Sequence, residues 1–180
     1  MEISMSRVLL VVDMQKGVFS TPRMDRIGRV ERINQLSRAA ERVIFILHNE
    51  ADLPLGSDEW ELLPELFQPE DSIYVDKTAC DAFYRTTLAD ELAALDAKHI
   101  TICGCATDYC VDTTIKNAAS RGYALTIASD AHTTADRGSL KAEQLIPYFN
   151  EVWATLAIPG NRIEVKTTAD ILQEWGNSVG

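Results

Sequence analysis

Continuous apolar runs recur along the chain and predict a sheet. Val8–Val12 is apolar at every position instead of every second one, as in a strand that is buried on both faces of a parallel sheet. Similar runs predict strands at residues 43–47, 72–75, 99–103 and 124–128, and a weaker run predicts one at 162–165. We therefore expect a mostly parallel sheet of about six strands.

Apolar residues recur at helical spacing between these runs. The predicted stripes are Ile27, Val30, Ile33 and Leu36; Leu88, Leu92 and Leu95 behind the start signal Thr87-x-x-Asp90; Val111, Ile115 and Ala118; and Leu145, Phe149, Val152 and Leu156, with Pro147 kinking the last helix. Strands that alternate with helices form βαβ units. The predicted fold is therefore a doubly wound α/β domain with helices on both faces of the sheet.

Length and composition fit one globular domain. The chain has 180 residues, of which 46% are hydrophobic and 24% are charged, so a single domain spanning residues 1–180 can bury a substantial core. No internal repeat or low-complexity tract interrupts it. The least regular stretch, residues 49–69, contains three prolines and is predicted to be a long loop over one edge of the sheet.

Charge and cysteine usage narrow the function classes. The net charge is −10 and no Lys/Arg run is present, which argues against nucleic acid and membranes as partners. The apolar runs are too short for a signal peptide or a membrane span. Cys80, Cys103, Cys105 and Cys110 are not spaced like a disulfide framework. We expect a cytoplasmic protein that acts on a small molecule.

Polar residues follow the predicted strands at their carboxyl ends, where open parallel sheets bind ligands. They are Asp13 after the first strand, His48 and Asn49 after the second, Lys77 after the third, residues 104–110 after the fourth and residues 130–134 after the fifth. All of them are expected at one edge of the sheet.

Cys110 is the candidate nucleophile at this edge. Thr107 is predicted to be the N-cap of the following helix, which puts Cys110 at the third helical position, where unpaired N–H groups and the helix dipole lower a thiol's pKa. The alternatives are a small buried Cys110, a capping Asp13 and a solvated surface Lys77. The combination of an acid, a base and a thiol at three strand ends favours catalysis.

A metal or redox site is an alternative use of the cysteines, built from Cys103, Cys105 and Cys110. Cys103 and Cys105 share a face only in an extended strand, and paired Cys-x-x-Cys spacing is missing. The spacing therefore gives this alternative little support.

Three motifs together resemble the isochorismatase-like cysteine hydrolases, which include nicotinamidases and N-carbamoylsarcosine amidase. The motifs are Val11-Val12-Asp13-Met14-Gln15, Lys77-Thr78-Ala79-Cys80-Asp81-Ala82-Phe83 and Gly104-Cys105-Ala106-Thr107-Asp108-Tyr109-Cys110-Val111-Asp112-Thr113-Thr114. The resemblance covers nearly the whole chain. It implies a catalytic triad of Asp13, Lys77 and Cys110, in which Asp13 takes the thiol proton and Lys77 holds Asp13.

The resemblance also implies how the site handles the developing negative charge. A cis peptide bond is expected between Cys105 and Ala106, and an oxyanion hole is expected from the N–H groups of Ala106 and Cys110. The implied reaction cleaves a C–N bond of a small amide, ureido or carbamoyl compound through a thioester and needs no cofactor.

Departures from the family pattern refine this expectation. Nicotinamidases bind a metal with an Asp-x-His pair and a further histidine after strand two, but here that place reads His48-Asn49-Glu50-Ala51-Asp52, so no metal is expected. Members that cleave the vinyl ether isochorismate lack the cysteine, and this chain keeps it. A vinyl ether hydrolase, and a member that binds small ligands without turnover, remain the alternatives.

Residues that flank the motifs are candidates for the pocket wall and for an interface. Aromatic walls are predicted from Phe19, Trp60, Phe83 and Tyr109, and polar substrate contacts from His48 and Asn49; for the aromatics, the alternative is ordinary core. Residues 144–158 carry more apolar surface than one helix face can bury, and family members are commonly dimers or tetramers. We expect a symmetric homo-oligomer, unless a kink at Pro147 lets both faces pack inside the monomer.

Overall fold

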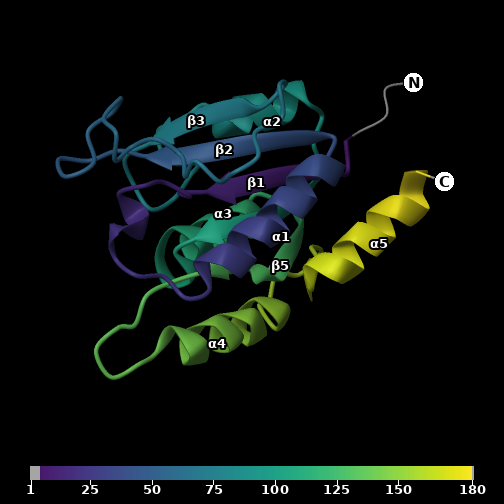
Figure 1. Cartoon of the computed structure of the whole chain (residues 1–180). Helices are drawn as coiled ribbons and strands as arrows, with labels where there is room; N and C mark the ends of the chain where they lie inside the picture. The colour runs from purple at the N-terminus through teal and green to yellow at the C-terminus, as the bar shows by residue number, and fades with distance from the viewer. Residues whose placement is uncertain (1–4, 180) are drawn as a thin grey trace.

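Six parallel strands form one sheet in the order β3-β2-β1-β4-β5-β6 (Figure 1). The computed structural model describes residues 5–179, with side chains up to residue 176. The strands are β1 (Val8–Val12), β2 (Arg42–His48), β3 (Ile73–Lys77), β4 (His99–Cys105), β5 (Ala124–Thr133) and β6 (Ile163–Lys166). The predicted doubly wound fold and all six predicted strands are confirmed. However, β3, β4 and β5 extend further at their carboxyl ends than the apolar runs indicate.

Helices cover both faces of the sheet. α1 (Arg26–Ala39) and α5 (Thr168–Val179) pack on the face that carries Leu9, Val11 and Phe45. α2 (Leu88–Ala94), α3 (Asp112–Ser120) and α4 (Ala142–Ala154) cover the opposite face. The apolar stripes in the sequence predict four of these helices but not α5. The prediction that Ile27 belongs to the buried stripe of α1 is wrong, because this side chain is 83% exposed.

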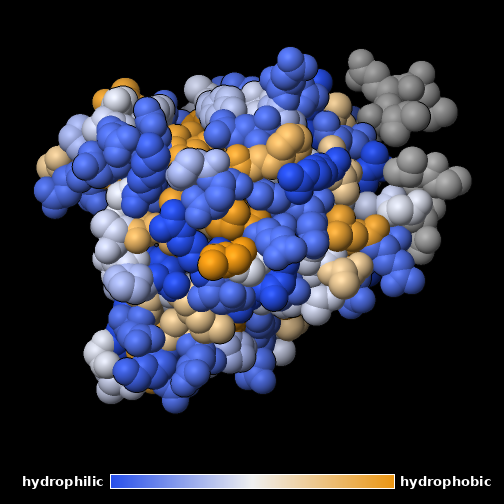
Figure 2. All heavy atoms as spheres, in the orientation of Figure 1, coloured by the Kyte–Doolittle hydropathy of each residue, from blue (hydrophilic) through white to orange (hydrophobic). Residues whose placement is uncertain are grey.

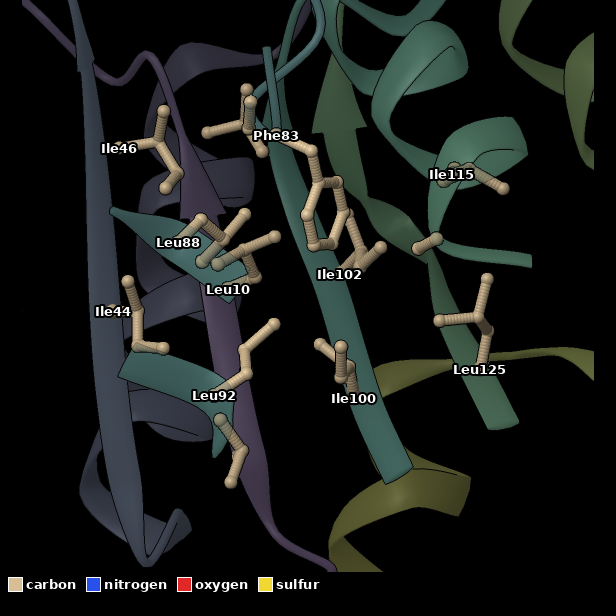
Figure 3. Packing of buried hydrophobic residues seen from close by; sticks show 14 of the residues in the cluster. Leu10, Ile44, Ile46, Phe83, Leu88, Leu92, Ile100, Ile102, Ile115 and Leu125 are labelled. Atoms are coloured by element: carbon tan, nitrogen blue, oxygen red, sulfur yellow. The ribbon is translucent and has the colours of Figure 1, made fainter. Parts of the chain in front are cut away.

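Alternating residues of each strand supply two separate core clusters, which explains the continuous apolar runs. Figure 3 shows one cluster, in which Leu10 of β1 and Ile44 and Ile46 of β2 face Leu88 and Leu92 of α2. Neighbouring strand residues point to the other face and pack against α1 and α5. Because both faces are buried, neither needs polar positions, and the period-two pattern of a half-exposed strand is lost.

The strand order reverses at β1, which pairs with β2 on one side and with β4 on the other. The carboxyl end of a sheet at such a switch point is where ligands bind in this architecture. Gly104 makes the close contact between β1 and β4 at this end. It has φ of 120°, and a Cβ atom there would lie 2.2 Å from the Val12 carbonyl oxygen.

α4 runs without interruption from Ala142 to Ala154, with Pro147 inside it. Its buried side chains include Leu145, Ile146 and Trp153, whereas Tyr148 remains 59% exposed. The helix therefore buries one apolar face against the sheet and leaves part of another uncovered within the described chain.

The surface is largely hydrophilic on the face drawn in Figure 2, where hydrophobic residues show only as small separate areas. Within residues 5–179, no helix has the length and apolar character that a membrane crossing requires.

Candidate active site

Asp13, Lys77 and Cys110 come together at the carboxyl edge of the sheet, from the ends of three different segments. The Lys77 Nζ atom lies 2.9 Å from Asp13 Oδ2 and 3.3 Å from Cys110 Sγ. The Lys77 side chain is completely buried and that of Asp13 is 4% exposed. The structure thus brings the three predicted side chains into contact, and it rules out Lys77 as a solvated surface lysine; the catalytic roles remain a prediction.

Asp13 leaves the strand through an unusual backbone conformation. β1 ends at Val12, and Asp13 has φ of 50°, in the left-handed region that aspartate tolerates better than most residues. Its N–H still donates to the Ile46 carbonyl oxygen at 3.0 Å, which holds the turn against β2. Its second carboxylate oxygen, Oδ1, is buried and has no hydrogen-bond partner among the described residues. That oxygen is available to accept a proton or a ligand N–H.

Lys77 has two further acceptors besides Asp13 and Cys110. Its Nζ lies 2.9 Å from His48 Nδ1 and donates to the Ala79 carbonyl oxygen at 2.9 Å. Burial opposes its charged form, but the negative charge of Asp13 and the hydrogen bonds to Asp13 and Cys110 favour that form more strongly, so the pKa of Lys77 is raised. The Lys77 side chain therefore carries its positive charge at neutral pH.

The contact with Lys77 also decides the state of His48. An ammonium has only donors, so His48 Nδ1 accepts, and the imidazole proton lies on Nε2. This Nε2 atom is 3.7 Å from Glu50 Oε1. His48 therefore presents an N–H donor at the end of β2.

Cys110 lies in a π-helical turn, η2 (Thr107–Val111), that leads directly into α3. The Cys105–Ala106 peptide bond before the turn is cis. The Ala106 carbonyl oxygen accepts the N–H groups of Tyr109 and Val111, each at 3.1 Å. The predicted N-cap role of Thr107 is wrong, because the capping position falls on Ala106, which makes no side-chain cap bond, and Thr107 lies inside the turn.

The predicted lowering of the Cys110 pKa is also wrong. Burial raises the pKa of this thiol, the negative charge of Asp13 raises it further, and the Lys77 ammonium opposes both. The direction follows because the thiol is largely buried and lies beside a carboxylate. Cys110 therefore rests as a thiol, and a nucleophilic role requires a base that removes its proton during the attack.

A buried chain of neutral hydrogen bonds holds the turn from the β5 side. Asn150 Nδ2 donates to the Ser129 carbonyl oxygen at 3.1 Å, so Asn150 Oδ1 is left to accept from His132 Nε2 at 2.8 Å. His132 Nδ1 then accepts from Thr107 Oγ1 at 2.7 Å. Burial lowers the pKa of His132 to about 4, which keeps the ring neutral. The sequence analysis places residues 130–134 at this edge but assigns His132 no part.

A pocket of about 380 Å³ opens over these groups. Its lining residues are Asp13, Val18, Arg23, His48, Glu50, Thr78, Cys80, Cys105, Ala106, Tyr109, Cys110 and Arg137. His48 and Tyr109 therefore line the pocket, as expected for substrate contacts, and Ala106 and Cys110 of the proposed oxyanion hole line it too.

Four other residues predicted to contact substrate do not line this pocket in the described chain. Phe83 packs in the core near Ile102 (Figure 3), and Phe19 and Trp60 belong to the cluster on the opposite face. Asn49 instead donates from Nδ2 to the Lys77 carbonyl oxygen at 3.2 Å. The reason is physical: the Phe19 and Phe83 rings gain most by burial, and the Asn49 amide satisfies the neighbouring backbone. Trp60 is partly buried against the same cluster as Phe19.

The family model for the isochorismatase domain matches residues 7–155. The chain belongs to the isochorismatase family. A solved isochorismatase family protein is 31% identical, has a TM-score of 0.82, and the alignment covers 91% of this chain and 100% of that one. This membership accounts for the three motifs that meet at the pocket.

Two curated relatives of this isochorismatase-family chain have named activities. A streptothricin hydrolase of Streptomyces noursei is 33% identical over 141 residues, which cover 72% of this chain and 55% of that protein. The ureidoacrylate amidohydrolase RutB of Variovorax paradoxus is 32% identical over 79 residues, which cover 44% of this chain and 31% of that protein. The chain thus spans about half the length of the first relative and a third of the second.

The cysteines do not gather into a ligand set. Cys103 and Cys105 are fully buried in β4, and burial raises the pKa of both thiols. Among the described residues, no group of three or more His, Cys, Asp and Glu side chains is arranged to hold a metal ion. Within residues 5–179, Cys103, Cys105 and Cys110 therefore form no three-cysteine metal site.

The two pocket arginines are site residues that the sequence analysis misses. Arg137 donates from Nε to Asp108 Oδ2 at 3.0 Å, and its guanidinium lies 4.7 Å from the centre of the Tyr109 ring. Arg23 donates from Nε to the Val18 carbonyl oxygen at 3.0 Å. Neither arginine belongs to a recognisable motif, and their positions depend on how distant loops fold together.

Proposed function

We propose that this chain is a cysteine hydrolase that cleaves a C–N bond of a small amide, ureido or carbamoyl compound through a thioester. The observation that carries the proposal is the buried Lys77 ammonium in simultaneous contact with Asp13 and Cys110, which both line the pocket. The named activities of the two curated relatives, a hydrolase and an amidohydrolase, support it.

The protonation states suggest the order of proton transfers. Cys110 rests as a thiol and Asp13 carries an unpartnered oxygen, so Asp13 takes the thiol proton as sulfur attacks the carbonyl carbon. Lys77 keeps its proton and offsets the negative charge that builds up at both neighbours. The N–H groups of Ala106 and Cys110 are proposed to donate to the oxyanion.

Collapse of the tetrahedral intermediate breaks the C–N bond. Asp13 returns the proton to the leaving nitrogen, so ammonia or an amine departs neutral and the acyl group stays on Cys110 as a thioester. Asp13, again a carboxylate, then takes a proton from water as the water oxygen attacks the thioester. The C–S bond breaks, the acid is released, and Asp13 returns this proton to the departing Cys110 sulfur. The enzyme ends in its starting protonation state, and no cofactor enters the balance.

A hydrolysis screen tests the proposal. Small primary amides, ureido acids and carbamoyl compounds are incubated with the wild type and with Cys110→Ala, and released ammonia is measured. The wild type should turn over at least one compound, and the variant should lose at least about 1,000-fold in rate. A 1:1 acyl adduct on Cys110 should appear in intact-mass spectra after rapid quenching.

The same screen separates the alternatives. An active Cys110→Ala variant would contradict the thioester route. A wild type that releases no ammonia from any of these compounds but hydrolyses a vinyl ether would favour the vinyl ether alternative. Tight binding of a compound that is never turned over would favour a binding protein.

We also propose a symmetric homo-oligomer, a dimer or tetramer, in which α4 contributes contacts. Beside α4, Tyr109, Leu145, Phe149 and the exposed Leu140 and Tyr148 line an apolar groove of about 600 Å³. Light scattering should return a multiple of 20.0 kDa, and Tyr148→Glu should lower the mass. A wild-type mass near 20.0 kDa at all concentrations would contradict the idea.

A further inference from the structure

Arg23 carries the one cationic group on the pocket wall for which the described residues supply no carboxylate partner. It lies between η1 (Val18–Ser20) and α1 and lines the pocket together with Asp13, Cys105 and Cys110. Its Nε donates to the Val18 carbonyl oxygen, but its Nη1 is buried and has no hydrogen-bond partner within residues 5–179. A buried guanidinium N–H without an acceptor is unfavourable unless a ligand supplies one.

The other two cations at the site are already balanced. Lys77 pairs with Asp13 at 2.9 Å, and Arg137 pairs with Asp108 at 3.0 Å. The remaining pocket carboxylate, Glu50, is mostly exposed and lies 3.7 Å from His48 Nε2 at the end of β2. Arg23 is therefore the pocket cation that has no ion-pair partner among the described residues.

Backbone contacts hold the segment around Arg23 in place. The Met24 N–H donates to the Thr134 carbonyl oxygen at 3.0 Å, and Thr133 Oγ1 donates to the Met24 carbonyl oxygen at 2.6 Å. These bonds tie the loop to the end of β5. The guanidinium is thus a positioned donor, and its planar fork matches the two oxygens of a carboxylate.

We propose that Arg23 binds a carboxylate of the substrate, so that the preferred substrates are amides, ureido compounds or carbamoyl compounds that also carry an acid group. This inference rests on the proposed hydrolysis for its substrate class, but the anion site itself is independent of turnover. The pocket volume of about 380 Å³ equals that of roughly a dozen water molecules, which limits the substrate to a small molecule.

The first experiment measures binding without chemistry. Cys110→Ala protein is titrated calorimetrically with small ureido and carbamoyl acids and with their methyl esters, which differ only in the charge. The acids should bind at least about 30-fold more tightly than the esters. Adding Arg23→Gln should remove this preference, whereas Arg26→Gln, at a surface arginine paired with Glu65, should leave it unchanged.

The second experiment uses the full enzyme. For an acid substrate, Arg23→Gln should lower kcat/KM by about 100-fold, mainly through KM, and Arg23→Lys should recover part of the loss. For the matched ester, both variants should behave like the wild type.

The outcomes separate the two proposals. Acid-selective binding that depends on Arg23, without any hydrolysis, would keep the anion site and overturn the proposed reaction. Equal or absent binding of acids and esters, or an equal loss for both in Arg23→Gln, would overturn the anion site whether or not the enzyme hydrolyses them.

Discussion

The two halves of the site hold their side chains by different kinds of interaction. On the β2–β3 side, a buried ammonium on Lys77 contacts Asp13, His48 and a backbone carbonyl. On the β4–β5 side, His132 links Thr107 to Asn150 through neutral hydrogen bonds. The first half fixes protonation states, because charges dominate there; the second fixes the position of the turn that carries Cys110. A charged half fails when one partner is removed, and a neutral half fails when it is protonated.

Breaking the charged half should have the largest effect. Lys77→Met leaves Asp13 as a buried carboxylate without its counter-ion, and hydrolysis should fall by at least about 1,000-fold, with a loss of about 3–5 kcal/mol in unfolding free energy. Initial rates and urea unfolding measure the two effects. Lys98→Met, at an exposed lysine, is the control. A Lys77→Met enzyme with near-normal rates would show that the ammonium is only structural.

The two halves of the site meet where β4 passes close to β1 at Gly104. Gly104→Ala adds a methyl group 2.2 Å from the Val12 carbonyl oxygen at a φ of 120°, so the unfolding free energy should fall by about 4 kcal/mol. Gly122→Ala is the matched control, because Gly122 also has positive φ but has open space around its Cα. Equal losses in the two variants would mean that backbone strain alone, and not the approach of β4 to β1, makes the glycine necessary.

The neutral half should weaken in acid. Unfolded chains bind a proton on His132 near its ordinary pKa of 6.5, whereas the folded chain does so only near a pKa of about 4. Below pH 6.5 the unfolded state therefore takes up more protons, and this part of the stability is lost as the pH falls, reaching about 3 kcal/mol at pH 4.

His132→Gln, which cannot be protonated, isolates this contribution. Urea unfolding at pH 7 and pH 4.5 should show a smaller loss for the variant than for the wild type, by about 2–3 kcal/mol. Parallel pH profiles for the two proteins would contradict the assignment.

Loss of the hydrogen bond between Thr107 and His132 should have the smallest effect of these changes. Thr107→Val keeps the shape of the side chain but removes the hydroxyl that donates to His132 Nδ1. It should cost about 1–2 kcal/mol of stability and lower kcat several-fold without changing KM, because only the placement of Cys110 is disturbed. Thr113→Val, in α3 outside the pocket lining, is the control. A change in KM alone would place Thr107 in substrate binding instead.

Much of the fold is predictable because the pattern that marks it is local. Strands buried on both faces show as unbroken apolar runs, and their order of alternation with helices leaves few topologies. The ends of β4 and β5 are less predictable, because Gly104 and the polar residues of Ala124–Thr133 continue the ladder without apolar character. The sequence does not predict α5, because of the side chains described in this helix only Ile171 and Trp175 are buried in the core cluster, and two residues make no recognisable apolar stripe.

The residues of the candidate site also fall into a group that the sequence predicts and a group that it does not. Asp13, Lys77 and Cys110 are predictable because motifs and strand ends mark them in sequence. Arg23 and His132 are not, because the features that matter are the buried Nη1 of Arg23, which has no hydrogen-bond partner within residues 5–179, and the hydrogen bonds of His132. Both arise only after distant segments meet. The pKa of Cys110 is raised and not lowered as predicted for a related reason: burial of the thiol outweighs any lowering of the pKa by the local turn.

The neutral chain places a constraint on anyone who redesigns the protein. Asn150 belongs to α4, the same helix that presents the exposed Tyr148, yet its amide is two hydrogen bonds away from the turn that carries Cys110. Solubility engineering on α4 has to treat Asn150 as part of the site and confine charged replacements to the outward positions. A mutation on the surface helix α4 can therefore shift the turn that carries Cys110.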